Sequence, residues 1–539
     1  MSLTRNIKYS LPVAAAFYLS VLTGCTKNFA SMNTNPNGLT DSMLQLDHAG
    51  LGAFFPVIEK NVIPVAANTG DGSVYQVAVN LNADLFSGYM GTPTAFGGGQ
   101  NNSTYALNSG WDNAPFNVGY NTVMPNWYQI RLRAAASNPD FYAVANILKV
   151  AAMHRITDVY GPLPYTGYGG GGYSVPYNGQ DVIYNAFFSE LDSAITTLSA
   201  YVAANPGATP LANYDLVFGG KYVEWIKFAN SLKLRLAMRI VYANPTLAQQ
   251  EAEAAVNNTY GVMTANTDNA FVGSANGITI YNPVWVIDYN YGDIRAGAVL
   301  GSFLNGYGDP RLPAIMTAST TYPGQYIGIR SGISILTSAD RTAREGFSSM
   351  NLNQNSPIQW MTAAEVDFLR AEGALRGWNM GGTAQSFYEG GIQLSFSYYG
   401  VGSAASYITN TTSTAAPYTD PVDATNNEAA GSPDLSTITI AWNSGDTFEH
   451  NLERIITQKW LAVFPNGEEA WAEFRRTGYP KVWPVLINYS QGTISTQIQI
   501  RRLPFPQVEY QNDNAAVTAA VSLLSGPDNG GTKLWWDKK

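Results

Sequence analysis

Carboxylate and histidine side chains are the groups with which this chain could carry out acid–base or metal chemistry. A glycosidase needs two carboxylates about 5–9.5 Å apart across a cleft, and the 39 acidic residues permit such a pair without locating one. The three histidines, His48, His154 and His450, are far apart and form no His-Glu-x-x-His motif, so no metal site is expected. The chain also lacks the Gly-x-Ser-x-Gly turn that carries the nucleophile of many serine hydrolases.

The acidic residues with the most regular spacing lie beside arginines, on two segments predicted to be helical. They are Glu365 and Glu372 beside Arg370 and Arg376, and Glu469 and Glu473 beside Arg475 and Arg476. Residues three or four positions apart share one face of a helix. Such charges usually form ion pairs within a helical body, so we predict a structural role for them and assign no catalytic residue.

Binding of an uncharged sugar is the chemistry that the composition favours. Charged residues make up 13% of the chain, against the usual ~25%, and aromatic residues make up 12%. A sugar packs its C–H face on aromatic rings and bonds its hydroxyls to amides or carboxylates, on loops held by a rigid scaffold. Residues 84–111 and 281–291 combine these groups, and we expect the two stretches to converge on one face. The predicted ligand-binding residues are Asp84, Tyr89, Asn101, Trp111, Trp285, Tyr289 and Tyr291.

The acidic balance of the chain argues against nucleic acid as a partner. The formal net charge is −9, and it becomes −11, from 28 basic and 39 acidic residues, when Arg5 and Lys8 are removed with the N-terminal segment. Nucleic-acid binding depends on the neutralisation of phosphates by lysine and arginine. Residues 91–111 contain three consecutive glycines but no lysine, which excludes a phosphate-binding P-loop, and no cofactor is predicted.

Residues 1–24 have the order of a secretory signal peptide: basic residues, an apolar run of about a dozen residues, then small residues. The run is too short to cross the ~30 Å hydrocarbon core of a bilayer as a helix. Leu-Thr-Gly-Cys at positions 22–25 resembles the lipobox of bacterial lipoproteins, in which the cysteine is lipidated and becomes the first mature residue. Cys25, the only cysteine, is therefore the predicted lipid attachment site; the alternative is an ordinary signal peptide with a chance cysteine.

The body of the chain, residues 41–539, is predicted to be a single, mostly α domain that follows a tether at residues 25–40. Helix pairs with the ~34-residue period of tetratricopeptide (TPR) repeats are expected around residues 41–90, 140–200, 221–257 and 363–399. Loop-rich insertions are expected at residues 91–111, 264–295 and 402–447. Asn276-Gly277 predicts a hairpin, residues 281–291 are predicted to be strand or loop, and Trp535-Trp536 predicts a docked C-terminal tail.

Several short strings in this order resemble the SusD/RagB family of nutrient-binding outer-membrane lipoproteins, across nearly the whole mature chain. They are residues 33–36 (NTNP), 230–239 (NSLKLRLAMR), 365–372 (EVDFLRAE), 458–462 (QKWLA), 469–480 (EAWAEFRRTGYP), 501–506 (RRLPFP) and 534–537 (LWWD). The loops at residues 91–111, 169–172 and 402–447 match no pattern of the family.

The resemblance implies a mostly α fold in which TPR-like helix pairs pack against an irregular, loop-rich half with a few short strands. It implies a lipid-anchored outer-membrane protein, facing outward, that binds a glycan or oligosaccharide without catalysis and delivers it to a TonB-dependent SusC-like transporter. The ligand could instead be a peptide. Two other functions remain open at this stage: a TPR-like interaction scaffold without a small ligand, and a glycosidase.

Overall fold

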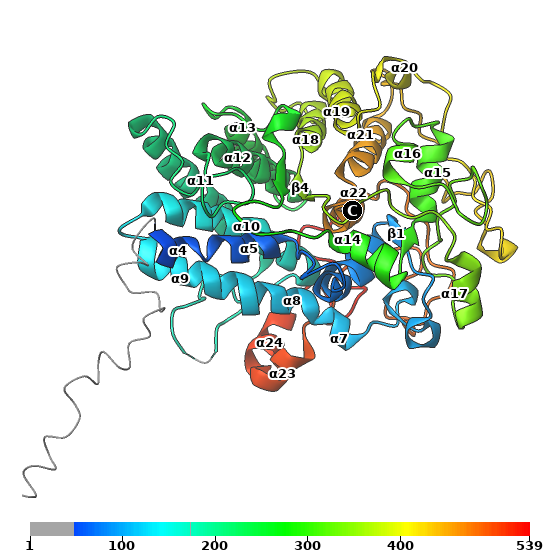
Figure 1. Cartoon of the computed structure of the whole chain (residues 1–539), viewed down its shortest axis with the longest axis horizontal. Helices are drawn as coiled ribbons and strands as arrows, with labels where there is room; N and C mark the ends of the chain where they lie inside the picture. Colours follow the sequence, from blue (N-terminus) through cyan, green and yellow to red (C-terminus); the bar gives the residue numbers. More distant parts are fainter. Residues whose placement is uncertain (1–47, 173) are drawn as a thin grey trace, which may run out of the picture. The chain divides into compact units, whose positions relative to one another are not determined.

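The computed structural model describes residues 48–172 and 174–539, which fall into two compact units (Figure 1). The described part of the first unit includes one turn of helix, α4 (Ala49–Gly52). The second unit runs from Ala53 to Lys539 and contains the remaining elements. The predicted signal peptide, Cys25 and the tether lie outside the described residues.

The second unit is mostly α-helical, as predicted, and its long helices form antiparallel neighbours along the chain (Figure 1). The long helices are α9 (Met124–Ala134), α10 (Pro139–Tyr160), α11 (Gln180–Ala204), α12 (Tyr222–Arg239), α13 (Pro245–Val256), α18 (Ala363–Leu375), α19 (Ala384–Tyr399), α21 (Phe448–Val463) and α22 (Gly467–Thr477). Helix α10 packs on α11, α12 on α13 and α18 on α19, within the predicted ranges. Whether these pairs are true TPR-like repeats stays a prediction.

Local sequence explains where these helices begin and end. Asn244 caps α13 by accepting a hydrogen bond from the Leu247 amide, and Pro245 occupies the first turn, where its missing N–H costs nothing. Helix α10 ends at Gly161, whose φ of 90° is unfavourable for residues that carry a Cβ. A capping residue followed by proline therefore marks the start of α13, and a glycine marks the end of α10.

Shorter elements make up the rest of the second unit. The helices there are α5 (Phe55–Val62), α6 (Ser73–Tyr75), η2 (Gln76–Asp84), η3 (Phe96–Gly99), η4 (Asn102–Thr104), α7 (Ser109–Asp112), α8 (Ala114–Val118), η5 (Gly119–Val123), η6 (Asn266–Asp268), α14 (Pro283–Trp285), η7 (Val286–Tyr291), α15 (Ala298–Gly306), α16 (Leu312–Ile315), α17 (Ser338–Arg344), α20 (Ala405–Ile408), η8 (Ala424–Asn426), α23 (Gln507–Asn512) and α24 (Asn514–Val521). Two small antiparallel sheets join segments that are far apart in sequence: β1 (Met90–Gly91) pairs with β3 (Arg295–Ala296), and β2 (Ala270–Val272) with β4 (Ile358–Met361).

The prediction of strand or loop for residues 281–291 is wrong, because this segment forms the consecutive short helices α14 and η7. Asn282 caps α14 by accepting a hydrogen bond from the Trp285 amide at 3.2 Å, and Pro283 follows in the first turn. This start signal outweighs the strand preference of the β-branched and aromatic residues after it. The predicted hairpin is confirmed: Ala275 and Ile278 pair across Asn276 and Gly277, which both have positive φ.

Two further predictions concern the insertion at residues 402–447 and the C-terminal tail. Residues 402–447 contain only α20 and η8 as helices, and they are anchored through Tyr407, whose hydroxyl donates to Asp309 at 2.7 Å. The predicted docking of the C-terminal tail is confirmed, because Trp536 is fully buried and its indole N–H donates to Asp158 Oδ1 at 2.8 Å.

A buried ion network joins five helices of the second unit. Its members are Asp158 on α10, Arg235 and Arg239 on α12, Glu365 and Glu372 on α18, Lys459 on α21, and Glu469, Glu473 and Arg476 on α22. The shortest contacts are Arg239 to Glu469 and to Glu473, and Arg476 to Glu372 and to Glu473, each 2.6 Å. The predicted structural role of these glutamates is therefore confirmed.

The cations of the network favour the charged forms of Glu372 and Glu469. Burial alone raises the pKa of Glu469 and of Glu372, but the surrounding cations lower both pKa values more, to below the usual range. For Glu469 the main cation is Arg239, and for Glu372 it is Arg476. Because the folded-state pKa values are depressed, this stabilisation is present above about pH 4.3 and is lost as the pH falls through the folded values.

The network predicts the stability of an Arg239→Met variant. The substitution removes one cation from three buried carboxylates, so we expect the free energy of unfolding to fall by about 3–5 kcal/mol, measured by urea denaturation. The control is Glu449→Gln, which breaks an exposed ion pair with Lys539 and should cost less than about 1 kcal/mol. Equal losses in the two variants would contradict a stabilising network.

Candidate functional site

The start of the first predicted ligand-binding stretch lies beside the end of the second. Strand β1 precedes the first loop and β3 follows the second, and they pair with Met90 opposite Ala296 and Gly91 opposite Arg295. Helices α7 and α14, which carry Trp111 and Trp285, both pack on η2. Figure 1 shows α7, α14 and β1 in the same part of the second unit.

Trp285 and Tyr289 form a stacked ring pair at the surface. They lie four positions apart on consecutive short helices, with ring centroids 5.8 Å apart and ring planes inclined by 22°. Trp285 is half-buried and Tyr289 is 46% exposed. The Tyr289 hydroxyl donates to the Met350 carbonyl at 3.0 Å, so this exposed ring is held in one position.

A second ring pair comes from the first stretch. Half-buried Trp111 meets half-buried Phe96 edge to face, with centroids 5.4 Å apart. The loop between them is fixed by buried amides: Asn101 donates to the Phe96 carbonyl at 2.9 Å, and Asn102 donates to Asp112 at 3.0 Å. The loop that presents these rings is therefore supported by its own polar side chains.

Asp293 links the two stretches. Its carboxylate accepts hydrogen bonds from Thr94 Oγ1 at 2.8 Å and Gln76 Nε2 at 2.9 Å, and Arg341 lies 3.5 Å away. Thr94 is two residues before Phe96, and Asp293 is four residues after Tyr289. Sequence reasoning missed this cluster, although Asp293 directly follows a predicted stretch and could have been included by its position.

Tyr291 supports the site by fixing an adjacent loop. Its hydroxyl accepts a hydrogen bond from the Gly72 amide at 2.9 Å and donates to the Gly70 carbonyl at 3.2 Å. Asn290 also donates to the Thr69 carbonyl. The two side chains tie residues 69–72 to the end of η7, and the Tyr291 ring stays half-buried.

Three predicted ligand-binding residues are buried, and the prediction that they belong to an exposed site is wrong. Tyr89 is fully buried against Trp460 and Phe464, at centroid distances of 4.9 and 5.2 Å. Asp84 is fully buried and accepts hydrogen bonds from Tyr75 and Asn80, each at 3.0 Å. Asn101 is 4% exposed, and its side chain caps η4 and bonds within its own loop.

Burial has a clear electrostatic effect on Asp84. Loss of hydration raises the pKa of its carboxyl to about 7, although hydrogen bonds from Asn80 and Tyr75 oppose the shift. A raised pKa can mark a functional carboxyl. Here the group faces the core and adjoins the first residue of α22, since a Cβ at Gly467 would lie 2.2 Å from Asp84 Oδ1. We therefore assign it to packing.

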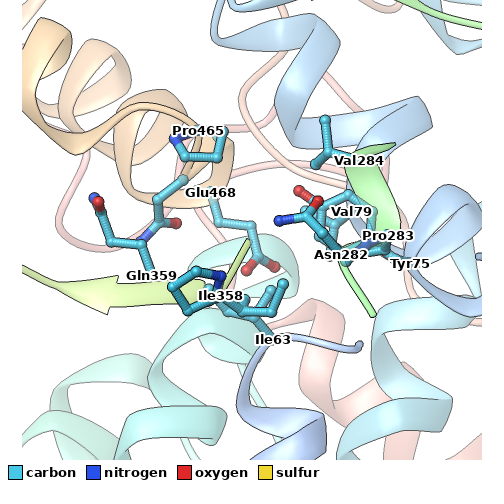
Figure 2. Close-up of a pocket in the computed structure, with 13 residues that line it drawn as sticks. Ile63, Tyr75, Val79, Asn282, Pro283, Val284, Ile358, Gln359, Pro465 and Glu468 are labelled. Atoms are coloured by element: carbon cyan, nitrogen blue, oxygen red, sulfur yellow. The ribbon is translucent and has the colours of Figure 1, made fainter. Parts of the chain in front are cut away.

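A small interior pocket with a volume of about 20 Å³ lies beneath α14. Figure 2 shows the Glu468 carboxylate projecting into it, next to the Asn282 amide and the side chains of Ile63 and Ile358. Arg155 pairs with Glu468 at 3.0 Å, and burial raises the pKa of that glutamate above its usual value. The pocket lies under the element that presents Trp285 and is mainly apolar.

Two classes of site are not found in the described residues. Among residues 48–172 and 174–539, no group of three or more His, Cys, Asp and Glu side chains could hold a metal ion. A search of the same residues for a helix that is long and apolar enough to cross a membrane found none.

The model of a protein family, described as Susd and RagB outer membrane lipoprotein, matches residues 31–537. A search of curated proteins found no match.

Three solved structures illustrate the similarity. A chitin-binding SusD homologue from Flavobacterium johnsoniae is 43% identical, with a TM-score of 0.86, over 91% of this chain and 99% of the other. A SusD homologue from Bacteroides uniformis is 38% identical, with a TM-score of 0.83, over 91% and 99% of the two chains. A SusD homologue from Bacteroides vulgatus is 36% identical, with a TM-score of 0.84, over 92% and 99%.

The geometry predicts that the surface rings contribute little to stability. Trp285 is half-buried, so Trp285→Ala should lower the free energy of unfolding by about 1 kcal/mol. The comparison is Trp460→Ala, which removes a ring that is 1% exposed and should cost about 3–5 kcal/mol. Urea denaturation measures both, and a loss at Trp285 as large as that at Trp460 would show that the ring serves packing.

Proposed function

This chain belongs to the SusD/RagB family of outer-membrane lipoproteins, and on that basis we propose that it captures a neutral glycan on the surface formed by Phe96, Trp111, Trp285 and Tyr289, called here the aromatic face. The family consists of carbohydrate-binding proteins that are not catalytic, so the protein is a glycan-binding protein of the outer membrane and the glycosidase alternative is removed. The residues that contact the glycan, its identity and its onward transfer are the parts that we propose.

The single observation that carries the site is the Asp293 cluster, which joins the chain segments that bear the two ring pairs. Thr94 and Gln76 donate to Asp293, which brings the loop before Phe96 to the end of the helix that bears Tyr289. A sugar chain that lies across this junction would meet rings at either side. It would also meet hydroxyl, amide, carboxylate and guanidinium groups between them.

The rings suit a sugar because they are at least partly exposed yet fixed. Tyr289 and Trp285 are stacked on each other, and Phe96 and Trp111 meet edge to face, so little conformational entropy is lost when a ligand packs on them. We propose chito-oligosaccharides as the first ligands to test, because the F. johnsoniae relative is described as chitin-binding. A peptide is the alternative ligand, and a glycan panel distinguishes the two.

We propose that the captured glycan passes to a TonB-dependent SusC-like transporter. Family membership supports this partner, and the lipid anchor at Cys25 would keep the two proteins in the same membrane. A scaffold without a small ligand remains the competing function. It would be favoured by a protein that binds a partner and no glycan.

Removal of single rings should weaken glycan binding. Trp285→Ala and Trp111→Ala are each expected to lose about 1–3 kcal/mol of binding free energy, judged from stacking on nucleic-acid bases, in calorimetry with chito-oligosaccharides. The matched control is Tyr398→Ala, another exposed and stacked ring, which lies on α19 and should leave affinity unchanged. Unchanged affinity in both tryptophan variants would eliminate the aromatic face as the site.

The anchor can be tested by fractionation. Cys25→Ala should move the protein from the membrane to the soluble fraction, because no lipid can be attached. Thr26→Ala, next to it, should leave the protein in the membrane. In the wild type, affinity purification from solubilised membranes should recover a barrel transporter, and its repeated absence would count against the transfer step. Protease treatment of intact cells that spared the wild type would overturn the outward orientation.

A further inference from the structure

A second cleft lies between helix α15 and two extended segments, residues 324–328 and 416–419. Its volume is about 370 Å³, within the range of about 300–1,000 Å³ typical of small-molecule sites. The helix contributes Gly301, Ser302 and Asn305 to the floor. None of the residues that form the aromatic face lines this cleft.

One wall of the cleft, residues 324–328, presents backbone groups to it because only alternate residues of this segment pair with a neighbouring segment. The Ile327 amide donates to Ser348 Oγ, and the Ile327 carbonyl accepts from the Ser348 amide, both at 2.9 Å. In an extended segment the flanking residues Tyr326 and Gly328 point the other way. Their carbonyls accept from Asn305 at 3.2 Å and from the Tyr418 hydroxyl at 2.8 Å. Their amides have no acceptor among residues 48–172 and 174–539.

The opposite wall has the same alternation. Ala416 bonds to Ser302 through both its amide, at 2.9 Å, and its carbonyl, at 2.5 Å. Tyr418 pairs with Glu428 through its amide at 2.9 Å and its carbonyl at 3.0 Å. Pro417 lies between Ala416 and Tyr418, and Thr419 follows Tyr418. In the described part of the chain, the carbonyls of Pro417 and Thr419 receive no hydrogen bond. The cleft is thus bordered by the amides of Tyr326 and Gly328, which have no acceptor in the described part of the chain.

The lining contains no charged side chain. The charges next to it are paired with each other: Arg330 contacts Glu428 at 3.0 Å, and Arg344 contacts Asp420 at 3.3 Å. A charged ligand would therefore meet no countercharge in the cleft, while a neutral polar ligand would satisfy the free backbone groups.

One ring in the cleft is available for stacking. Tyr326 is half-buried, and its ring packs on no other aromatic ring in the described residues. Exposed amides of Asn305 and Gln325 lie in the same lining. A ring, side-chain amides and free backbone groups together form the combination that a sugar requires.

We propose that this cleft is a second binding site for a neutral glycan, separate from the aromatic face. The proposal rests on the proposed function, because it assumes that the protein handles glycans. A long polymer that occupies both sites at once would bind more tightly than a short oligosaccharide, since the second contact is intramolecular. The cleft would then favour capture of polymeric over fragmented glycan.

Calorimetry with chitotetraose at saturating concentration tests the proposal by stoichiometry. The wild type should bind two equivalents, and Trp285→Ala should retain mainly the cleft site. Tyr326→Ala should weaken the cleft site about tenfold, which equals about 1.4 kcal/mol, without changing the other site. Tyr398→Ala, an exposed tyrosine on α19 outside both sites, is the control and should bind as the wild type does.

A second variant fills the cleft without disturbing the fold. A Cβ at Gly301 would meet Met316, Asn305 and Tyr326 only at 3.7–3.8 Å, which are ordinary contacts. Gly301→Leu also improves helix propensity in α15. The variant should fold as the wild type does, measured by circular dichroism, and should bind one equivalent of chitotetraose.

The outcomes separate the cleft from the proposed function. One equivalent in the wild type, weakened by Trp285→Ala and unaffected by Tyr326→Ala or Gly301→Leu, overturns the cleft and leaves the aromatic face intact. No binding by the wild type to any neutral glycan of a panel overturns both. A tenfold weakening of one of the two sites in Tyr326→Ala and the loss of one equivalent in Gly301→Leu, with Tyr398→Ala unchanged, support the second site. If an extended peptide binds in the cleft and no glycan of the panel does, the assignment of the cleft to glycans is overturned.

Discussion

The buried ion network is the constraint on which the rest of the structure depends. The residues of the network run from Asp158 to Arg476 along the sequence, and its acidic members lie on α10, α18 and α22. Removal of any one partner leaves an uncompensated charge in the core, whereas correct assembly satisfies all of them. Arg239 alone contacts Asp158, Glu469 and Glu473, so it fixes α12 against α10 and α22 together. The helical half is thereby a defined framework for the loops.

The burial of charged side chains also explains which functional groups remain on the surface loops. The chain has few charged residues, and many of them form ion pairs in the interior, such as Arg235 with Glu365 at 2.7 Å. The loops are left with amides, hydroxyls and aromatic rings as their functional groups, as around Trp285 and Tyr289. Such a surface offers few cations to neutralise phosphate groups and gives neutral polar ligands the advantage. Framework and ligand class are therefore linked through the distribution of charge.

The sequence was sufficient where a feature depends on neighbours along the chain, and insufficient where it depends on distant contacts. Helical spacing located the glutamates of the network, and Asn276-Gly277 located a hairpin. Trp111, Trp285 and Tyr289 lie partly exposed as a sugar site requires, but nothing local distinguishes Tyr289 from the fully buried Tyr89. Asp293 was missed because its partners Gln76 and Thr94 lie about 200 residues away.

The aromatic face and the cleft at α15 share one backbone ladder. The Gly297 amide donates to the Tyr89 carbonyl at 2.7 Å, and the Ile329 amide donates to the Ala296 carbonyl at 2.8 Å. Three segments of the chain approach each other closely here. A Cβ at Gly297 would lie 2.2 Å from the Gly88 carbonyl oxygen, and one at Gly328 would lie 2.3 Å from the Gly297 carbonyl oxygen. Only glycine fits such approaches. The ladder holds the loop before Phe96 and the wall that bears Tyr326 at a fixed separation, and binding of one polymer at two sites requires such a separation.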